Sequence, residues 1–517
     1  MKKIILGIVL AMCSFSGLKA QEISATIGPE LKDTKNGYMI GFAGSDENNF
    51  YALRLNYKGI SRTYLLDRYS KQLDLEVSVP LYVYGEKKIR ATNMESVMLV
   101  GNKLFAISHL VTTSDKLRTY HATEIDKETL LPKGNPIELG EVTMVNDGTN
   151  KGPFSISLSP DSTKILATYL LPYEEGSTYN YGIKIFDNTF SLLWENNFEL
   201  PFRDPLYAVN NAKIDNQGSV FLSGKVFDKT EPTEKKKKDI AYQFHLFAFS
   251  QNQAEPTEYI IDSKSNFLNE FSFFLNDKHE IVCYGFYTEK LNEPLSDGTF
   301  YAKIDAKTKK VLSEKMISFY DYYVSKGEYS GKDTRKLNFK YKQLVQNPDG
   351  SSTLVAEQVF TILEFVSSSQ SSAVSTVTTN YYNNIMVLKF DKEGNLIWLK
   401  TIPKGQRTGD PAGTYMSYAF FNKNNNIYLF FNEATFIQEE EIKQSGIKVY
   451  RSTEQLGFLN AYAINDDGVI SYKKTLFDQT ETHVLITPLH YLSISDKQLI
   501  LFGRLTEINR FAEVIIE

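Results

Sequence analysis

Cysteine and tryptophan are scarce in this chain, which has two of each among 517 residues. Cys13 lies in the apolar N-terminal stretch, so Cys283 is the single cysteine in the rest of the sequence. A lone cysteine forms no intramolecular disulfide, which excludes a disulfide-stapled scaffold and requires a hydrophobic core to hold the fold. We expect Cys283, within the apolar run 281–284, to be a small buried side chain and not a reactive thiol.

An excess of positive charge is also absent, because 57 Lys and Arg stand against 62 Asp and Glu, a net charge of −5. Removal of the first 20 residues would take Lys2, Lys3 and Lys19 with it and leave a net charge of −8. Since phosphate binding favours a positive surface, we expect no nucleic-acid partner.

The first 20 residues have the pattern of a secretory signal peptide. Two lysines precede an apolar run at 4–12, and small residues lead to Ala20. The run is far shorter than the ~20 residues that a membrane-spanning helix needs. We therefore predict cleavage before Gln21, no transmembrane segment after cleavage, and export to the periplasm or cell surface. Acylation of Cys13, as in a lipoprotein, is the alternative.

The abundant residues are Tyr and Phe, with 32 and 34 copies, and both favour half-buried β-strands. One short pattern recurs eight times: an alternating apolar run, a tight turn of Asn, Asp, Gly, Ser or Lys, and a second apolar run, which together indicate a β-hairpin. The eight turns lie at 45–48, 101–103, 159–162, 215–218, 276–278, 347–350, 422–425 and 495–497.

A second hairpin follows each of the first seven turns, as in the closely similar segments 184–194 and 389–398. Two hairpins per unit give four antiparallel strands per unit, which is typical of a β-propeller. The uneven repeat, 54 residues from Asp161 to Asp215 and 75 from Asp349 to Asn424, disfavours a parallel solenoid. We predict an all-β fold over 21–517, a single propeller of eight four-stranded blades, with seven blades as the alternative.

The eighth unit, 484–517, ends after three strands and lacks a second hairpin. A strand-like segment at about 22–31 precedes the first unit. We predict that this N-terminal strand completes the last blade and closes the ring, which removes an open sheet edge. A disordered N-terminal tail is the alternative.

The segment 158–166, with Ser159-Pro160-Asp161-Ser162 at its centre, resembles the hairpin motif of the WD40-like repeats in TolB-type propellers. The segment 347–351 is a partial second copy. The resemblance covers these two short windows. It implies a propeller scaffold and no particular reaction.

Long connections are expected on one face of the propeller, because second-to-third strand loops and blade-to-blade loops emerge together and are the long ones here. Several of these segments combine Tyr with Lys and Arg, a pairing enriched at binding hot spots. The candidate binding residues are Tyr82, Tyr84, Lys87, Lys88, Arg90, Tyr320, Tyr322, Tyr323, Lys326, Arg335, Lys404 and Arg407.

No local catalytic, metal-binding or phosphate-binding motif is present in the sequence, so we expect no cofactor and no metal. These observations favour a monomeric, non-enzymatic binding scaffold for an envelope protein or polysaccharide. The alternative is a hydrolase or lyase that acts on a glycan or small molecule at the mouth of the central channel. Its carboxylates would come from different loops, with Asp204, Asp321 and Asp410 as candidates.

Overall fold

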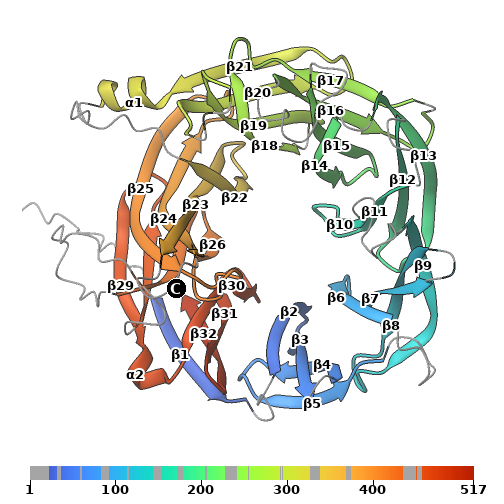
Figure 1. Cartoon of the computed structure of the whole chain (residues 1–517), viewed down its shortest axis with the longest axis vertical. Helices are drawn as coiled ribbons and strands as arrows, with labels where there is room; N and C mark the ends of the chain where they lie inside the picture. The colour runs from blue at the N-terminus through green and yellow to red at the C-terminus, as the bar shows by residue number, and fades with distance from the viewer. Residues whose placement is uncertain are drawn as a thin grey trace, which may run out of the picture.

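A computed structural model describes residues 23–31, 37–58, 61–82, 92–112, 114, 116–143, 154–171, 178–203, 207–227, 241–253, 255–276, 278–291, 293, 295–326, 338–367, 374–434, 450 and 457–517. Its strands form eight four-stranded antiparallel sheets around a common axis (Figure 1). The chain is therefore an eight-bladed β-propeller, and the prediction of eight blades rather than seven is confirmed.

The four strands of a blade follow one another in chain order from the axis outward in the first seven blades. The strands of the first four blades are β2 (Gly37–Ser45), β3 (Asn49–Lys58), β4 (Ser61–Ser70) and β5 (Leu75–Pro80); β6 (Thr92–Val100), β7 (Lys103–Thr112), β8 (Leu117–Ile125) and β9 (Pro132–Thr143); β10 (Phe154–Leu158), β11 (Lys164–Leu170), β12 (Thr178–Asp187) and β13 (Leu192–Arg203); β14 (Tyr207–Ile214), β15 (Val220–Phe227), β16 (Tyr242–Phe249) and β17 (Thr257–Ile261).

The other four blades are built in the same way, and the last one takes its outer strand from the N-terminus. Their strands are β18 (Phe267–Leu275), β19 (Glu280–Thr288), β20 (Gly298–Asp305) and β21 (Val311–Ser318); β22 (Phe339–Gln346), β23 (Ser352–Ser367), β24 (Val374–Phe390) and β25 (Leu396–Thr408); β26 (Ala419–Lys423), β27 (Asn426–Glu433), β28 (Phe458–Ile464) and β29 (Ile470–Asp478); β30 (Leu485–Ser493), β31 (Gln498–Leu505), β32 (Ile508–Ile516) and β1 (Ile23–Glu30). Two short helices, α1 (Phe319–Ser325) and α2 (Gln479–Thr482), follow β21 and β29.

Strand β1 closes the ring by pairing antiparallel with β32, from Ile23 opposite Ile516 to Glu30 opposite Arg510. Ile23 is buried in a hydrophobic cluster formed by residues of blades 7 and 8, and Ile27 packs against the same cluster. The predicted closure by an N-terminal strand is therefore confirmed.

Side-chain hydrogen bonds explain why the tight turns form where the sequence indicates them. In the turn that joins β24 to β25, the Asp391 carboxylate accepts from the backbone N–H of Glu393 at 2.9 Å and of Asn395 at 2.8 Å. Gly394 in this turn has a φ of +84°, a value that glycine adopts without strain. Asp187 holds the corresponding turn of blade 3 in the same manner.

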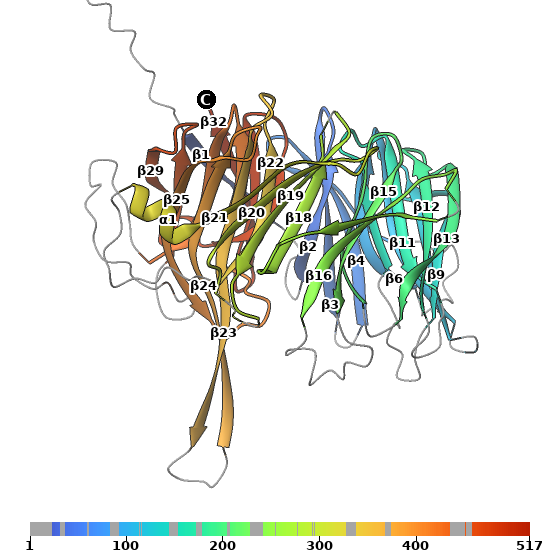
Figure 2. The ribbon, with the colours of Figure 1, turned by 90° about the horizontal axis from the view of Figure 1, so that it is seen from above.

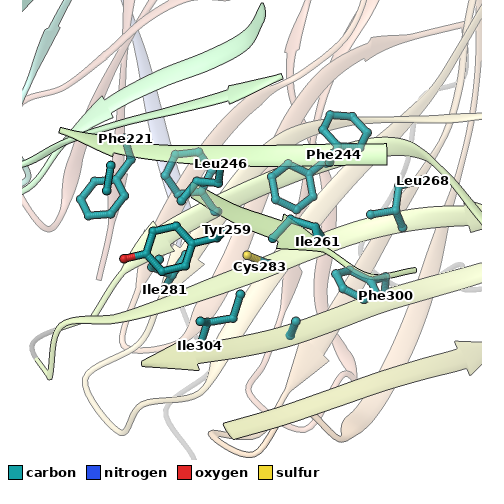
Figure 3. Close-up of a cluster of buried hydrophobic side chains, with 14 of the residues drawn as sticks. Phe221, Phe244, Leu246, Tyr259, Ile261, Leu268, Ile281, Cys283, Phe300 and Ile304 are labelled. Atoms are coloured by element: carbon teal, nitrogen blue, oxygen red, sulfur yellow. The ribbon is translucent and has the colours of Figure 1, made fainter. Parts of the chain in front are cut away.

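The hydrophobic core lies between neighbouring blades, because each blade buries the two faces of its sheet against the next. Figure 3 shows one such cluster, where Phe221 and Leu246 of blade 4 meet Ile281 and Phe300 of blade 5. Cys283 is fully buried in this cluster, and burial raises the pKa of its thiol. The expectation of a buried, unreactive Cys283 agrees with this environment.

Candidate functional site

The two faces of the ring differ in their connections (Figure 2). First-to-second and third-to-fourth strand turns lie on one face, which we call the short-turn face. Second-to-third strand connections and blade-to-blade connections lie on the opposite face, because successive strands of a blade run in opposite directions. The strand bounds place every connection longer than eight residues on this second face, which we call the loop-rich face.

Part of the predicted binding set lies outside the described residues, namely Tyr84, Lys87, Lys88, Arg90 and Arg335. Two of the predicted tyrosines that the structure describes are well exposed, Tyr82 at 69% and Tyr320 at 55%. Both side chains are accessible to a partner, and their binding role stays a prediction.

Helix α1 carries the remaining predicted tyrosines and lies on the outer circumference of the ring, beside β25 (Figure 1). The Tyr322 hydroxyl accepts from the backbone N–H of Leu399 at 2.8 Å and so occupies a donor of the outermost strand of blade 6. Tyr323 is buried. The Lys326 ammonium lies 5.7 Å from the centre of the Tyr322 ring. Tyr322 and Tyr323 thus have structural contacts that the sequence did not indicate.

The placement of Lys404 and Arg407 in a loop was wrong, because both belong to β25, which continues to Thr408. Lys404 is fully buried and forms an ion pair of 2.8 Å with Glu357, which is also fully buried. Burial lowers the pKa of Lys404, and the Glu357 carboxylate opposes this effect. Lys404 also donates to the Tyr382 carbonyl at 2.7 Å. A buried charge with these partners serves the fold and offers no cation to a ligand.

A hydrogen-bonded chain of polar side chains crosses from blade 1 to blade 2 on the loop-rich face. Arg62 of β4 donates to the Asn93 side-chain oxygen, and Asn93 Nδ2 lies 3.1 Å from His109 Nε2. The other ring nitrogen of His109 contacts a Glu95 carboxylate oxygen. Neither ring nitrogen of His109 is therefore open to act as a base on a substrate. These hydrogen bonds instead hold the exposed Arg62 in a fixed position.

The partners of His109 also determine its tautomer. Asn93 accepts from Arg62 through its oxygen, so its amide nitrogen is the group that faces His109 Nε2. Nε2 accordingly accepts, and the proton lies on Nδ1, which donates to Glu95. This hydrogen bond lowers the pKa of the Glu95 carboxyl, and burial opposes the shift.

Two exposed tyrosines of blade 1 also lie at the loop-rich face. Tyr38 on β2 and Tyr57 on β3 have exposed fractions of 37% and 38%, and their hydroxyls are 3.2 Å apart. Their ring centres are separated by 5.8 Å. Sequence reasoning missed this pair, although the hairpin around the 45–48 turn brings both residues to the far end of the same two strands. We call Tyr38, Tyr57 and Arg62 the blade 1 patch.

Four inner strands carry an inserted polar residue that interrupts the register: Glu95, Asn210, Asn269 and Lys342. Such β-bulges change the direction of a side chain and are frequent beside binding sites. Asn210 donates to the Phe271 carbonyl of the next blade at 3.2 Å, and Lys342 lies 3.4 Å from Glu357. Asn210 therefore links the inner strands of blades 4 and 5, whereas Lys342 contacts the second strand of its own blade.

Of the three carboxylates proposed for a hydrolase, the structure describes two, Asp321 and Asp410. Asp204 lies outside the described residues. Asp321 lies in the first turn of α1. Asp410 accepts from the Thr414 backbone N–H at 3.0 Å and from the Thr414 hydroxyl at 2.6 Å, which fixes a turn. Burial raises the pKa of Asp410, but the bonds to Thr414 outweigh it and the net shift is downward.

A pocket of about 570 Å³ lies on the short-turn face between blades 5 and 6. Its lining includes Tyr284, Tyr301 and the turn residues Asn347 and Glu393. A second pocket of about 350 Å³ lies between blades 3 and 4 beside Trp194. Sequence reasoning assigned no site to this face.

Within the described part of the chain, no group of three or more His, Cys, Asp and Glu side chains is placed to hold a metal ion. The helices in that part are also too short and too polar to span a membrane.

No protein-family model matches the sequence, and no curated protein matches it. Among solved structures, the chain is similar to the β-propeller domain of the Trilobed protease from Pyrococcus furiosus, at 13% identity over 85% of this chain and 97% of that one, with a TM-score of 0.37. It is also similar to prolyl oligopeptidase B from Galerina marginata, at 8% identity over 91% of this chain and 55% of that one, with a TM-score of 0.42. Cobalt-substituted Synechocystis ACO matches at 9% identity over 96% of this chain and 93% of that one, with a TM-score of 0.34. At these values the similarities carry no argument about function.

Proposed function

We propose that this protein is an exported, non-enzymatic scaffold that binds an envelope protein or polysaccharide through its loop-rich face. The observation that carries the proposal is the blade 1 patch. Two exposed tyrosines in mutual contact lie with an exposed arginine on the face that also receives every long connection. Tyr and Arg are the residues that most often dominate binding energy at interfaces.

The patch is also rigid, which favours binding because less conformational freedom is lost. Tyr38 and Tyr57 are held by the β2–β3 hairpin and by their hydroxyl contact. Arg62 is held by Asn93 of the next blade. A tyrosine ring presents both an apolar surface and a hydroxyl, so the patch suits a polar polymer or a protein surface.

The scaffold is favoured over a hydrolase or lyase because the acidic residues of the described inner strands, Glu95 and Glu270, are already paired. Glu95 is bonded to His109, and Glu270 lies 2.5 Å from Lys340. Glu357, on the second strand of blade 6, is buried and lies 2.8 Å from Lys404. A glycoside hydrolase needs two carboxyl groups free to reach the scissile bond from opposite sides.

The proposal is tested by capture of envelope components on immobilised protein. We expect a component that binds the wild type and is lost with the triple variant Tyr38→Ala, Tyr57→Ala, Arg62→Ala. The matched control, Lys278→Ala with Lys392→Ala, changes exposed residues of the short-turn face and is expected to retain the component. Retention by the triple variant, or release of the component in a cleaved form, would contradict the proposal.

A further inference from the structure

Strands β23 and β24 extend well beyond the ring, as Figure 2 shows on the side away from the C-terminus. Their pairing continues from Ser352 opposite Phe390 to Ser367 opposite Val374. The neighbouring strands stop earlier, because β22 pairs with β23 only as far as Gln358, and β25 pairs with β24 only as far as Asn380. We call residues 361–367 and 374–380 the blade 6 arm.

In the described structure, no strand pairs with the outer edges of the arm except at its base, where Asn380 lies opposite Thr408 of β25. Each edge therefore presents a row of backbone N–H and C=O groups. Side-chain contacts join the two strands at the base of the arm. The Phe360 and Tyr381 rings stack with their centres 4.8 Å apart, and the Thr361 hydroxyl donates to the Asn380 side-chain oxygen at 2.7 Å. An ordered pair of strands with free edges is a template for another strand.

The side chains of the arm lack the features that normally protect a free edge. Ile362, Leu363 and Val377 are exposed at 38%, 59% and 44%. From 359 to 382 the sequence has no Pro, Lys or Arg, and Glu364 is its single charge. Proteins usually place charges, prolines or bulges on edge strands to prevent pairing with other chains. A two-stranded hairpin is also only marginally stable in water without a covering partner.

The size of the arm indicates what kind of partner covers it. Seven residues span about 23 Å, and a pair of strands offers roughly 230 Å² a face, or roughly 460 Å² on both faces. A stable protein dimer buries about 800 Å² on each partner. The arm alone is therefore too small for a dimer of this chain. It suffices for an added peptide strand, whose affinity comes mainly from main-chain hydrogen bonds.

We infer that the blade 6 arm binds an extended segment of a partner polypeptide by β-strand addition along the β23 edge. This is the edge of β23 that pairs with β22, the inner strand, nearer the ring. A strand bound along it therefore lies beyond the end of β22, outside the ring on the side of the loop-rich face. Glu364 favours a segment that carries a lysine or arginine. The inference rests on the proposed scaffold function and selects a polypeptide as the molecule that the scaffold holds.

The test uses a nine-residue peptide of alternating valine and threonine with a lysine at each end. A fluorescent form is titrated onto wild-type protein and onto a shortened-arm variant, in which residues 361–380 are replaced by Asn-Gly to close a tight turn at the arm base. We expect at least a tenfold weaker affinity for the shortened-arm variant. We expect the same loss when the inner residues of the peptide are N-methylated, because N-methylation removes the donors that strand pairing needs.

Equal affinity for both proteins, equal affinity for both peptides, or no binding of the unmodified peptide to the wild type would overturn the inference. An arm-dependent dimer in sedimentation would overturn it too, because a second copy would then be the occupant. The methylated peptide keeps the test valid if the shortened chain does not fold. Envelope capture by the blade 1 patch is measured separately with the arm intact, so a failure of the arm and a failure of the scaffold give different results.

Discussion

Ile23, the first residue of β1, lies directly opposite Ile516, the last residue of β32, although 492 residues separate them in the chain. Both side chains are buried in the core shared by blades 7 and 8. The N-terminal strand therefore holds the ring closed and covers the outer edge of the last blade. A second hydrophobic cluster, in which Phe50 and Tyr69 of blade 1 pack with Phe502 and Phe511 of blade 8, also joins the two ends of the ring.

A chain that begins at residue 31 is expected to lose at least about 3 kcal/mol in the free energy of unfolding, because burial of Ile23 and Ile27 is lost. It is also expected to associate through the exposed edge of β32. Chemical denaturation and sedimentation measure both effects, and a chain that begins at Gln21 is the control. Equal stability of the two chains would show that β1 does not hold the ring.

Replacing Lys404 with methionine separates a structural role from a binding role. It leaves the buried Glu357 carboxylate with Lys342 at 3.4 Å and the Ser417 hydroxyl at 2.7 Å as its partners. We expect a loss of about 3 kcal/mol in the free energy of unfolding. Lys392→Met on the exposed short-turn face is the control and is expected to change stability by less than about 0.5 kcal/mol. A Lys404→Met protein of normal stability that binds envelope components poorly would instead support the predicted binding role of Lys404.

Lys213 gives the protein a distinct dependence of stability on pH. Burial lowers its pKa to about 8, while its amine donates to the Phe273 carbonyl and the nearby Cys283 thiol remains neutral. Between pH 8 and the ordinary lysine pKa of 10.5, the unfolded chain binds more protons than the folded one, so this group makes stability rise with pH. At pH 7 the buried charge costs on the order of 3 kcal/mol.

The variant Lys213→Met is therefore expected to be more stable than the wild type at pH 7 by about 1–2 kcal/mol, after the loss of the hydrogen bond to Phe273 is counted. The difference between the two proteins is expected to shrink as the pH is raised from 8 to 10.5. Urea denaturation at several pH values measures it. A difference that does not change with pH would contradict a lowered Lys213 pKa.

Two glycines with the same backbone angle test how tightly neighbouring blades pack. Gly394 and Gly350 both have a φ of +84°. A Cβ on Gly394 would lie 2.0 Å from the Tyr301 ring of blade 5, whereas on Gly350 its nearest neighbour is Lys392 Cβ at 3.4 Å. Gly350→Ala is expected to lower the free energy of unfolding by about 1 kcal/mol, because alanine is strained at this backbone angle. Gly394→Ala is expected to cost a further 1–3 kcal/mol or so, because the ring must move. Thermal denaturation compares the two, and equal costs would argue against the Tyr301 contact.

Local chemistry explains why most of the fold could be predicted. Turn residues such as Asp391 and Gly394 act within a few positions of themselves, so the hairpins, and with them the eight blades, are visible in the sequence. The Lys404 contact is of another kind, because Glu357 lies 47 positions earlier and meets it only after β23 and β25 flank β24. A lysine in a polar segment gives no sign of such a partner.

The candidate site was harder to predict than the fold for the same reason. Glu95 reaches His109 from a bulge in β6, and no residue pattern marks the position of that bulge. The blade 1 patch joins residues on three strands, and Arg62 is fixed by Asn93 of another blade. The pair of Tyr38 and Tyr57 is different, because the hairpin around the recognised turn at 45–48 joins their strands. The sequence contains enough information to place these two residues together, although the pair was missed.

The most direct test of the central claim is the affinity of the captured envelope component, once purified, for three proteins: the wild type, the blade 1 patch variant and the short-turn-face variant. The account predicts that the change of Tyr38, Tyr57 and Arg62 to alanine weakens binding at least a hundredfold, about 2.7 kcal/mol, while the short-turn-face variant binds like the wild type. Equal affinity of the wild type and the patch variant, or a loss confined to the short-turn-face variant, would contradict it.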